Sequence, residues 1–178
     1  MSSNRPSEKR PETIAITAGR PVVAPDSELN QSISLNSTFA AGGPIGYGRY
    51  GNETWTSLET AIGALEGGKT LSYSSGMAAV SAVFSTLPVG AKVVASNQGY
   101  SGVMTLLGKL SEAKKISATL VSIANTDEVI AALDGADFLW LESPTNPSLD
   151  VADLPVLIKA AKSRNITVAV DNTFATAL

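Results

Sequence analysis

The side chains that could do chemistry in this chain are limited, because its 178 residues include no histidine and no cysteine. These absences exclude a disulfide framework, thiolate nucleophiles, imidazole bases and ordinary zinc ligation by side chains. In a largely parallel sheet, ligands bind outside the carboxyl ends of the strands. The polar residues that directly follow predicted strands are therefore the candidates for a functional site.

The first such candidate is an anion site. Ser75, Gly76 and Met77 follow the predicted strand Thr70 to Tyr73, at the start of a predicted helix. Free backbone N–H groups and the helix dipole at this point favour an anion such as a phosphate. An ordinary capped turn between a strand and a helix would use the same residues.

A second segment could also bind a phosphate. Tyr47 and Arg49 combine a phenol with a guanidinium, which can hold a phosphate by two-pronged hydrogen bonding. The overlapping motif Gly46-x-Gly48-x-x-Gly51 matches the dinucleotide fingerprint. No apolar strand precedes it and its third glycine does not directly open a packed helix, so we interpret it as a polar loop. A nicotinamide-binding enzyme is accordingly only a third alternative.

Two further candidates are a ring and an amide. Tyr100 follows the predicted strand Lys92 to Ala95 and could stack on a planar ligand, although a tyrosine here also fits core packing. Asn146 lies in the segment Glu142-Ser143-Pro144-Thr145-Asn146-Pro147, after the predicted strand Phe138 to Leu141. We expect the two prolines to hold this loop in one extended course and to fix the Asn146 amide. A connection selected only for its shape is the alternative.

The last candidate is a carboxylate. Asp171 ends the predicted strand Ile166 to Val170, so it should emerge at the floor of the site, where a buried carboxylate needs a cationic partner. A helix N-cap is the alternative. A phosphate site, a stacking ring, a fixed amide and a deep carboxylate together fit pyridoxal phosphate (PLP), a planar phosphorylated heterocycle whose ring nitrogen needs an acidic partner.

The elements that must position these residues form an α/β pattern. Residues 1–52 are rich in Pro, Gly, Ser and Asn, and we expect an extended arm without helical periodicity. Residues 53–178 then form one domain, which opens with a helix behind the capping box of Thr56 and Glu59 and ends that helix at Gly67.

Beyond Lys69 short apolar runs alternate with helical ones, which predicts a mostly parallel sheet with helices on both faces. A shorter helix should begin at Asn125, with Glu128 returning the capping bond. The remaining predicted strands are Ala118 to Ile123 and those named above, and the packing helices contain Val80 to Leu87, Val103 to Leu110 and Leu154 to Ala161.

Charge and composition limit the classes of binding partner and the cellular location expected for this protein. The net charge is −3 and no basic run is longer than Lys114-Lys115, so a nucleic-acid partner is not indicated. The start of the chain, Met1 to Glu12, is polar with no apolar run behind it, which indicates neither a signal peptide nor a membrane span. We expect a cytoplasmic protein.

Four motifs in order resemble the landmarks of the Cys/Met-metabolism (trans-sulfuration) family of PLP enzymes. They span nearly the whole chain from Thr13 onward. Such a resemblance implies the PLP-dependent transferase fold of type I. The motifs are Tyr47-Gly48-Arg49-x-x-Asn52-x-Thr54, Ser74-Ser75-Gly76-Met77-Ala78-Ala79, Glu142-Ser143-Pro144-Thr145-Asn146-Pro147 and Asp171-Asn172-Thr173-Phe174.

The resemblance also implies a role for each candidate. Tyr47 and Arg49 would reach the cofactor phosphate of a neighbouring subunit, so the enzyme would be at least a dimer, and we expect a tetramer. Ser75, Gly76 and Met77 would hold the phosphate of their own subunit. Tyr100 would stack on the pyridine ring and act as the catalytic residue in this chain, Asn146 would bond the ring hydroxyl, and Asp171 would keep the ring nitrogen protonated.

The chain departs from the family pattern in three places. Glu53 follows Asn52 where the family often has proline, and Ser101-Gly102 stands where it usually has two glycines. The family's Schiff-base lysine lies beyond the Asp-Asn-Thr strand, and no matching Ser-x-Thr-Lys segment precedes Leu178. We therefore expect a fragment that ends before the catalytic lysine and before the end of the large domain, and we interpret its own lysines as surface charges.

The reaction implied is cystathionine gamma-synthase-like, in which cysteine thiol replaces the gamma substituent of an O-acylhomoserine. A cystathionine gamma- or beta-lyase and an O-acetylhomoserine sulfhydrylase remain alternatives, because the cofactor residues are shared across the family. A non-catalytic chain that binds the cofactor or a partner subunit is the alternative from another class, and the absent lysine is its support.

Overall fold

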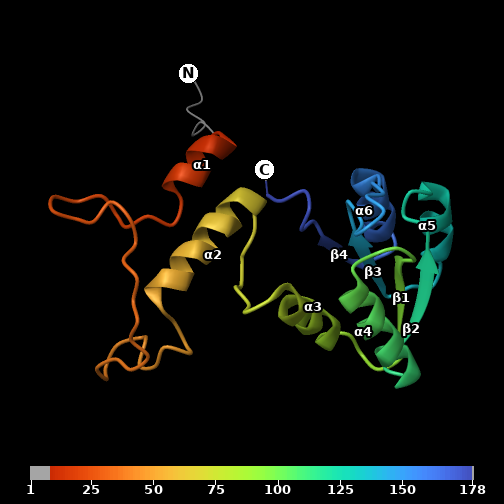
Figure 1. Cartoon of the computed structure of the whole chain (residues 1–178), viewed down its shortest axis with the longest axis horizontal. Coiled ribbons are helices and arrows are strands. Elements are labelled where there is room, and N and C mark those ends of the chain that lie inside the picture. The colour runs from red at the N-terminus through yellow and green to blue at the C-terminus, as the bar shows by residue number, and fades with distance from the viewer. Residues whose placement is uncertain (1–8, 178) are drawn as a thin grey trace. The chain divides into compact units, whose positions relative to one another are not determined.

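The computed structural model describes residues 9–177, which fall into two compact units (Figure 1). The first unit comprises the chain up to Ser72 together with Ala177, and the second unit is Tyr73–Thr176. Within residues 9–177, no helix has both the length and the apolar character needed to cross a bilayer.

The first unit contains two helices that pack against each other, α1 (Pro11–Thr17) and α2 (Glu53–Glu66). Helix α1 was not predicted. It has proline at its first position and an acidic residue in its first turn, both of which favour a helix start, but it buries no residue and is too short to show periodicity.

Helix α2 begins earlier than predicted. The Asn52 side chain accepts a hydrogen bond from the Thr54 N–H at 2.9 Å and donates one to the Ser34 carbonyl at 3.1 Å, so Asn52 is the N-cap. The predicted capping box of Thr56 and Glu59 is therefore wrong, because a better cap lies one turn before it. The predicted end is confirmed, since Gly67 adopts a left-handed conformation with φ of 68°.

The predicted strand Thr70 to Tyr73 is absent from the structure. A strand needs a ladder of backbone hydrogen bonds, and here the Ser72 N–H instead bonds a Glu59 carboxylate oxygen at 2.7 Å. The apolar residue in the middle of this segment, Leu71, is 73% exposed. This segment therefore joins the two units without joining a sheet.

The second unit is built on a parallel sheet of four strands in the order β2-β1-β3-β4. The predicted parallel sheet is confirmed. The third predicted strand, Ala118 to Ile123, lies two residues earlier, because the ladder with β1 starts at Ile116 and ends at Val121. The strands are β1 (Ala91–Ser96), β2 (Ile116–Val121), β3 (Phe138–Glu142) and β4 (Thr167–Asp171).

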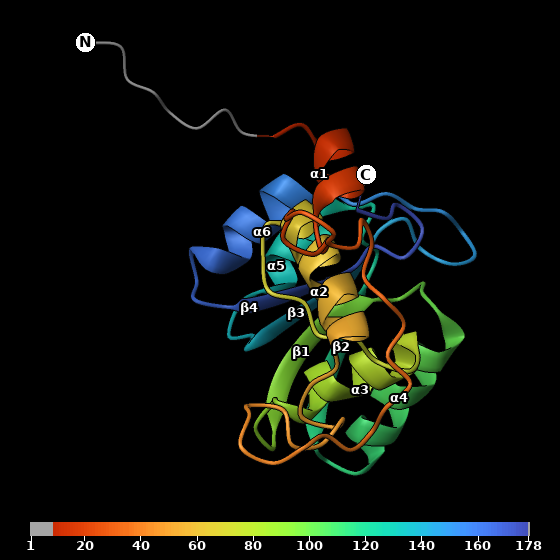
Figure 2. The ribbon, with the colours of Figure 1, turned by 90° about the vertical axis from the view of Figure 1, so that its left-hand side faces the viewer.

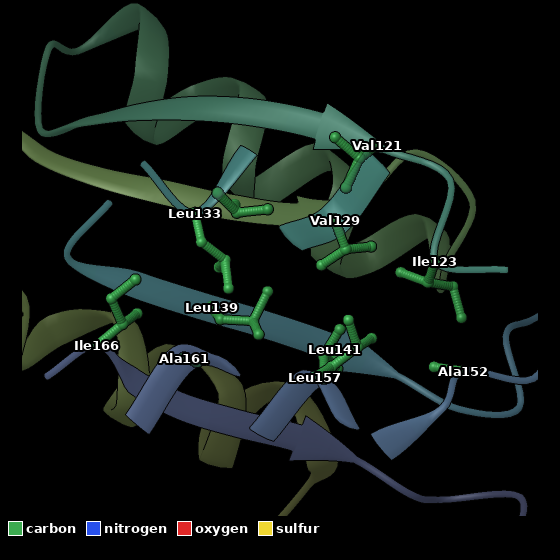
Figure 3. Packing of buried hydrophobic residues seen from close by; sticks show 11 residues of the cluster. Val121, Ile123, Val129, Leu133, Leu139, Leu141, Ala152, Leu157, Ala161 and Ile166 are labelled. Atoms are coloured by element: carbon green, nitrogen blue, oxygen red, sulfur yellow. The ribbon is translucent and has the colours of Figure 1, made fainter. Parts of the chain in front are cut away.

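Helices cover both faces of this sheet, as predicted (Figure 2). Side chains along a strand point alternately to opposite faces, so Leu139 and Leu141 of β3 pack under α5 and α6, while Phe138 and Trp140 pack under α3 and α4. Figure 3 shows the first of these cores. The helices are α3 (Gly76–Ser85), α4 (Ser101–Glu112), α5 (Thr126–Ala132) and α6 (Leu154–Lys162).

The predicted start of α5 is confirmed in part. The Asn125 side chain caps the helix by accepting a hydrogen bond from the Glu128 N–H at 3.2 Å. The Glu128 carboxylate does not return the bond to Asn125. It accepts from the Ser122 N–H at 3.2 Å, because the chain turns after β2 and brings that amide within reach.

The strand order determines where a ligand can bind. From β1 the chain moves to β2 on one side and then crosses to β3 on the other, so the crossover direction reverses between β1 and β3. In open α/β sheets, the loops that follow two such strands diverge and leave a crevice at the carboxyl edge.

The core beneath this edge predicts a stability difference between two leucines of the sheet. Leu139 is fully buried, whereas Leu120 on the edge strand β2 is 46% exposed. We expect Leu139→Ala to lower the free energy of unfolding by about 2–5 kcal/mol, through lost transfer energy and a residual cavity. Leu120→Ala should cost about 1 kcal/mol or less. Urea unfolding followed by circular dichroism measures both, and equal losses would contradict the assigned core.

Candidate active site

A cavity of about 320 Å³ lies at the carboxyl edge of the sheet, within the second unit. Its volume is at the lower end of the range of small-molecule sites. The cavity brings together residues from the N-terminus of α3 and from the loops after β1, β3 and β4. It is lined by the predicted residues Ser75, Gly76, Met77, Tyr100, Asn146 and Asp171, and by Val80, Glu142, Pro144, Thr173 and Phe174.

The N-terminus of α3 supplies hydrogen-bond donors to the cavity. Ser75 is the N-cap, and its hydroxyl oxygen accepts a hydrogen bond from the Ala78 N–H at 3.1 Å. Helix geometry leaves the N–H groups of Gly76 and Met77 without an intrahelical acceptor. The Ser75 hydroxyl thus satisfies the Ala78 N–H and leaves the N–H groups of Gly76 and Met77 able to bind an anion. The positive end of the helix dipole favours such binding.

The ring of Tyr100 is held close to the start of α3. A Cβ atom at position 102 would lie 2.7 Å from the Tyr100 Cε1 atom and 2.9 Å from the Met77 Sδ atom. A side chain at this position would force the Tyr100 ring or the Met77 side chain to shift, so Gly102 allows the phenol to lie close to the helix N-terminus. The departure Ser101-Gly102 therefore keeps a glycine at the position of this close contact.

The carboxylate of Glu142 joins two of the cavity loops. Glu142 is the last residue of β3 and is 5% exposed. Its Oε2 atom accepts from the Tyr100 N–H at 2.8 Å, and its Oε1 atom accepts from the Asn146 N–H at 2.8 Å. The sequence placed Glu142 in a motif but assigned it no role, because a contact with Tyr100 across 42 positions has no local signal.

The loop that carries Asn146 does not run in the predicted extended course. The Thr145 N–H bonds the Asp150 carbonyl at 3.0 Å, and the Leu149 N–H bonds the Thr145 carbonyl at 2.9 Å, so the loop folds back on itself. Thr145 is fully buried, and its hydroxyl accepts from the Asp150 N–H at 2.9 Å. The predicted extended course is wrong because the buried threonine hydroxyl between the two prolines bonds the backbone further along the loop.

Asp171 is oriented by the residue two positions further on. Its Oδ1 atom accepts from the Thr173 N–H at 3.0 Å and from the Thr173 hydroxyl at 2.6 Å. No helix follows within residues 172–177, so Asp171 is not a helix N-cap. Its second carboxylate oxygen receives no hydrogen bond from a described residue and can accept one from a ligand. Thr173 and Phe174 also line the cavity, and the motif Asp171-Asn172-Thr173-Phe174 is the sequence signal for them.

Groups of both signs line the cavity. Glu142 and Asp171 are register partners on β3 and β4, so two carboxylates lie side by side at the sheet edge. The α3 N-terminus lines the same cavity with partial positive charge. Neither lysine nor arginine is among the lining residues. The cavity therefore suits a molecule that carries both an anionic group and a protonated nitrogen.

Tyr47 and Arg49 lie in the first unit, apart from this set. The Arg49 Nη2 atom donates to the Tyr47 hydroxyl at 3.4 Å, and the guanidinium carbon lies 5.4 Å from the centre of the Tyr47 ring. The structure brings these two predicted residues together but does not place them relative to the cavity. Their role in binding a phosphate stays a prediction.

The lysines of the chain lie at the surface, as predicted. Each lysine from Lys69 onward is exposed, and none lines the cavity.

The dinucleotide fingerprint at Gly46 lacks the strand and the helix that such a motif needs on either side. Within the described residues no strand precedes it, and α2 opens two residues after Gly51.

The sequence matches the family model described as "Cys/Met metabolism PLP-dependent enzyme" over residues 10–178. A Streptomyces coelicolor protein provisionally named a cystathionine gamma-lyase is 45% identical over 142 residues, covering 76% of this chain and 36% of the relative. The cystathionine gamma-synthase of Mycobacterium tuberculosis is 36% identical over 174 residues, covering 93% of this chain and 45% of that protein.

Solved structures resemble the chain over almost its whole length. The crystal structure of metB from Corynebacterium glutamicum superposes with a TM-score of 0.87 at 34% identity, covering 97% of this chain and 47% of the other. Cystathionine gamma synthase from Xanthomonas oryzae, solved in complex with cystathionine, gives a TM-score of 0.87 at 28% identity, covering 95% and 46%. The chain thus spans less than half the length of these proteins.

These similarities confirm the predicted fold class, a mostly parallel α/β sheet of the kind found in PLP-dependent cystathionine synthases and lyases. The predicted cofactor, PLP, is that of the whole family. The chain belongs to the Cys/Met metabolism family of PLP-dependent enzymes.

Proposed function

We propose that the complete gene product is a trans-sulfuration enzyme in which the thiol of cysteine replaces the gamma substituent of an O-acylhomoserine. The choice of reaction is supported by the similarity to the Mycobacterium tuberculosis cystathionine gamma-synthase over 93% of this chain. The choice of cofactor chemistry is supported by the cavity, which unites a helix N-terminus, a phenol ring, a loop amide and a strand-end carboxylate. This donor set fits PLP, which has a phosphate, a planar ring, a ring hydroxyl and a ring nitrogen. PLP, when bound, supplies the electron sink that such chemistry at an amino acid requires.

Each lining residue has a role in the proposed site. The N–H groups of Gly76 and Met77 bind the phosphate, supported by the Ser75 cap that fixes the first turn of α3. The Tyr100 ring stacks on the pyridine ring. Asn146 bonds the ring hydroxyl, and Asp171 keeps a proton on the ring nitrogen through its second carboxylate oxygen.

The proposed assembly is at least a dimer and, in the complete protein, a tetramer. Residues 1–52 would act as an arm that brings Tyr47 and Arg49 to the phosphate in a neighbouring subunit. The absence of lysine and arginine from the cavity lining supports this assignment, since a phosphate dianion would otherwise be met only by backbone N–H groups.

A cystathionine lyase is the second candidate. The observation that favours it is the name of the Streptomyces coelicolor relative, which has a higher identity to this chain than the Mycobacterium synthase has. Synthases and lyases occur together among the relatives because both use PLP, so the residues of this cavity do not separate the two reactions.

We predict that Asp171→Ala in the complete gene product lowers kcat by on the order of 10²-fold or more, because charge stabilisation at the ring nitrogen is lost. The matched control is Asp127→Ala, which removes an exposed carboxylate from the first turn of α5 and should leave kcat unchanged. Steady-state kinetics with PLP at saturation measure both. Turnover by Asp171→Ala at the rate of the unaltered protein would rule out the role given to Asp171.

The reaction itself can be assigned by product analysis. We expect the complete gene product with PLP to form cystathionine from an O-acylhomoserine and cysteine, measured by mass spectrometry. Release of a 2-oxo acid, ammonia and a thiol from added cystathionine, without the synthesis, would identify a lyase, and use of sulfide in place of cysteine would identify a sulfhydrylase. A protein that binds PLP but turns over none of these substrates would support the non-catalytic alternative.

A further inference from the structure

The carboxylate of Glu142 differs from the other glutamates that bond loop amides in this chain. Glu59 accepts from Ser72, and Glu128 accepts from Ser122, so each of them joins its helix to one neighbouring segment. Glu142 is buried and accepts from two amides with two separate oxygens, both at 2.8 Å. The two amides belong to the residues whose side chains are the ring and the amide of the proposed PLP site.

The burial of this charge is not explained by an ion pair. Within residues 9–177, no basic side chain forms a salt bridge with Glu142, and no lysine or arginine lines the cavity. The partners that stabilise it are backbone N–H groups, which are fixed dipoles. A buried carboxylate costs free energy unless its hydrogen bonds are made, so both bonds must persist in the folded state.

The packing around the carboxylate restricts its position further. A Cβ atom at Gly99 would lie 2.8 Å from the Glu142 Oε2 atom, so the loop after β1 approaches the carboxylate through a residue without a side chain. Because Glu142 ends β3, this contact ties the loop after β1 to the sheet. One side chain thereby fixes two loops on either side of the crevice between β1 and β3.

We propose that Glu142 is a positioning residue that sets the spacing of Tyr100 and Asn146 for PLP. The inference rests on the proposed function, because it assumes that these two side chains contact the cofactor. Glu142 acts through the backbone of both residues and bonds the cofactor with neither oxygen. It must accept at both oxygens, so an amide side chain of the same shape cannot replace it.

The test is a thermodynamic mutant cycle in the complete gene product, in which the Kd for PLP is measured for each variant. In Glu142→Gln, one oxygen becomes a donor group that faces a backbone N–H, and we expect the Kd for PLP to rise roughly tenfold, the size of one charge-assisted hydrogen bond. In a background that carries both Tyr100→Ala and Asn146→Ala, the same change should raise Kd by less than about twofold, because the positioned side chains are gone. Equilibrium dialysis against PLP gives all four values.

The control is Glu128→Gln, which alters an exposed glutamate that accepts from one loop N–H instead of two. It should leave the Kd for PLP unchanged. Gly99→Ala provides a second variant. Its Cβ would displace the Glu142 carboxylate while position 142 keeps its glutamate, so this variant should also raise the Kd for PLP. The circular dichroism band of bound PLP, recorded at saturation, should change in Glu142→Gln because the ring contacts shift.

A second measurement does not depend on PLP. Hydrogen exchange of the Tyr100 and Asn146 amides in the free protein should be faster in Glu142→Gln than in the unaltered protein or in Glu128→Gln. Failure of the unaltered protein to bind PLP would overturn the proposed function and, with it, this inference. If the unaltered protein binds PLP, equal weakening in both backgrounds, or an unchanged Kd in Glu142→Gln, would overturn the inference alone.

Discussion

The parallel pairing of β1 with β3 is the constraint on which the rest of the second unit depends. Because the two strands run in the same direction, the loops that follow them leave the sheet at the same edge, and because the chain reverses its direction of crossing between them, those loops diverge. Tyr100 and Asn146 lie in these loops, and Asp171 ends the next strand along. The strand order thus places the crevice at this edge, and the side chains then line it.

Side-chain hydrogen bonds then convert this edge into a defined site. Ser75 caps α3, Thr173 orients Asp171, and Glu142 joins the loops of Tyr100 and Asn146. The Ser75 and Glu142 oxygens accept from backbone amides, whereas the Thr173 N–H and hydroxyl donate to the Asp171 carboxylate. Such support reduces the freedom of the contacting side chains, which is what a preorganised site requires.

Family membership defines the cofactor and the fold class of this chain but not its reaction. Similarity to synthases and lyases establishes the cofactor and the fold class, because those are shared. The choice between gamma-replacement and elimination depends on groups that meet the substrate. The chain spans less than half the length of these relatives.

The sequence by itself determined the alternation of strands and helices, the parallel sheet and the positions at which polar residues follow strands, because these depend on local periodicity. It predicted Asp171, Tyr100, Asn146 and the start of α3, which the structure places around one cavity. Only the tertiary structure decided that Asn52 caps α2, that residues 70–73 form no strand and that the loop at Thr145 folds back. It also revealed the bonds of Glu142, because hydrogen bonds between residues far apart in sequence form only after the sheet has assembled.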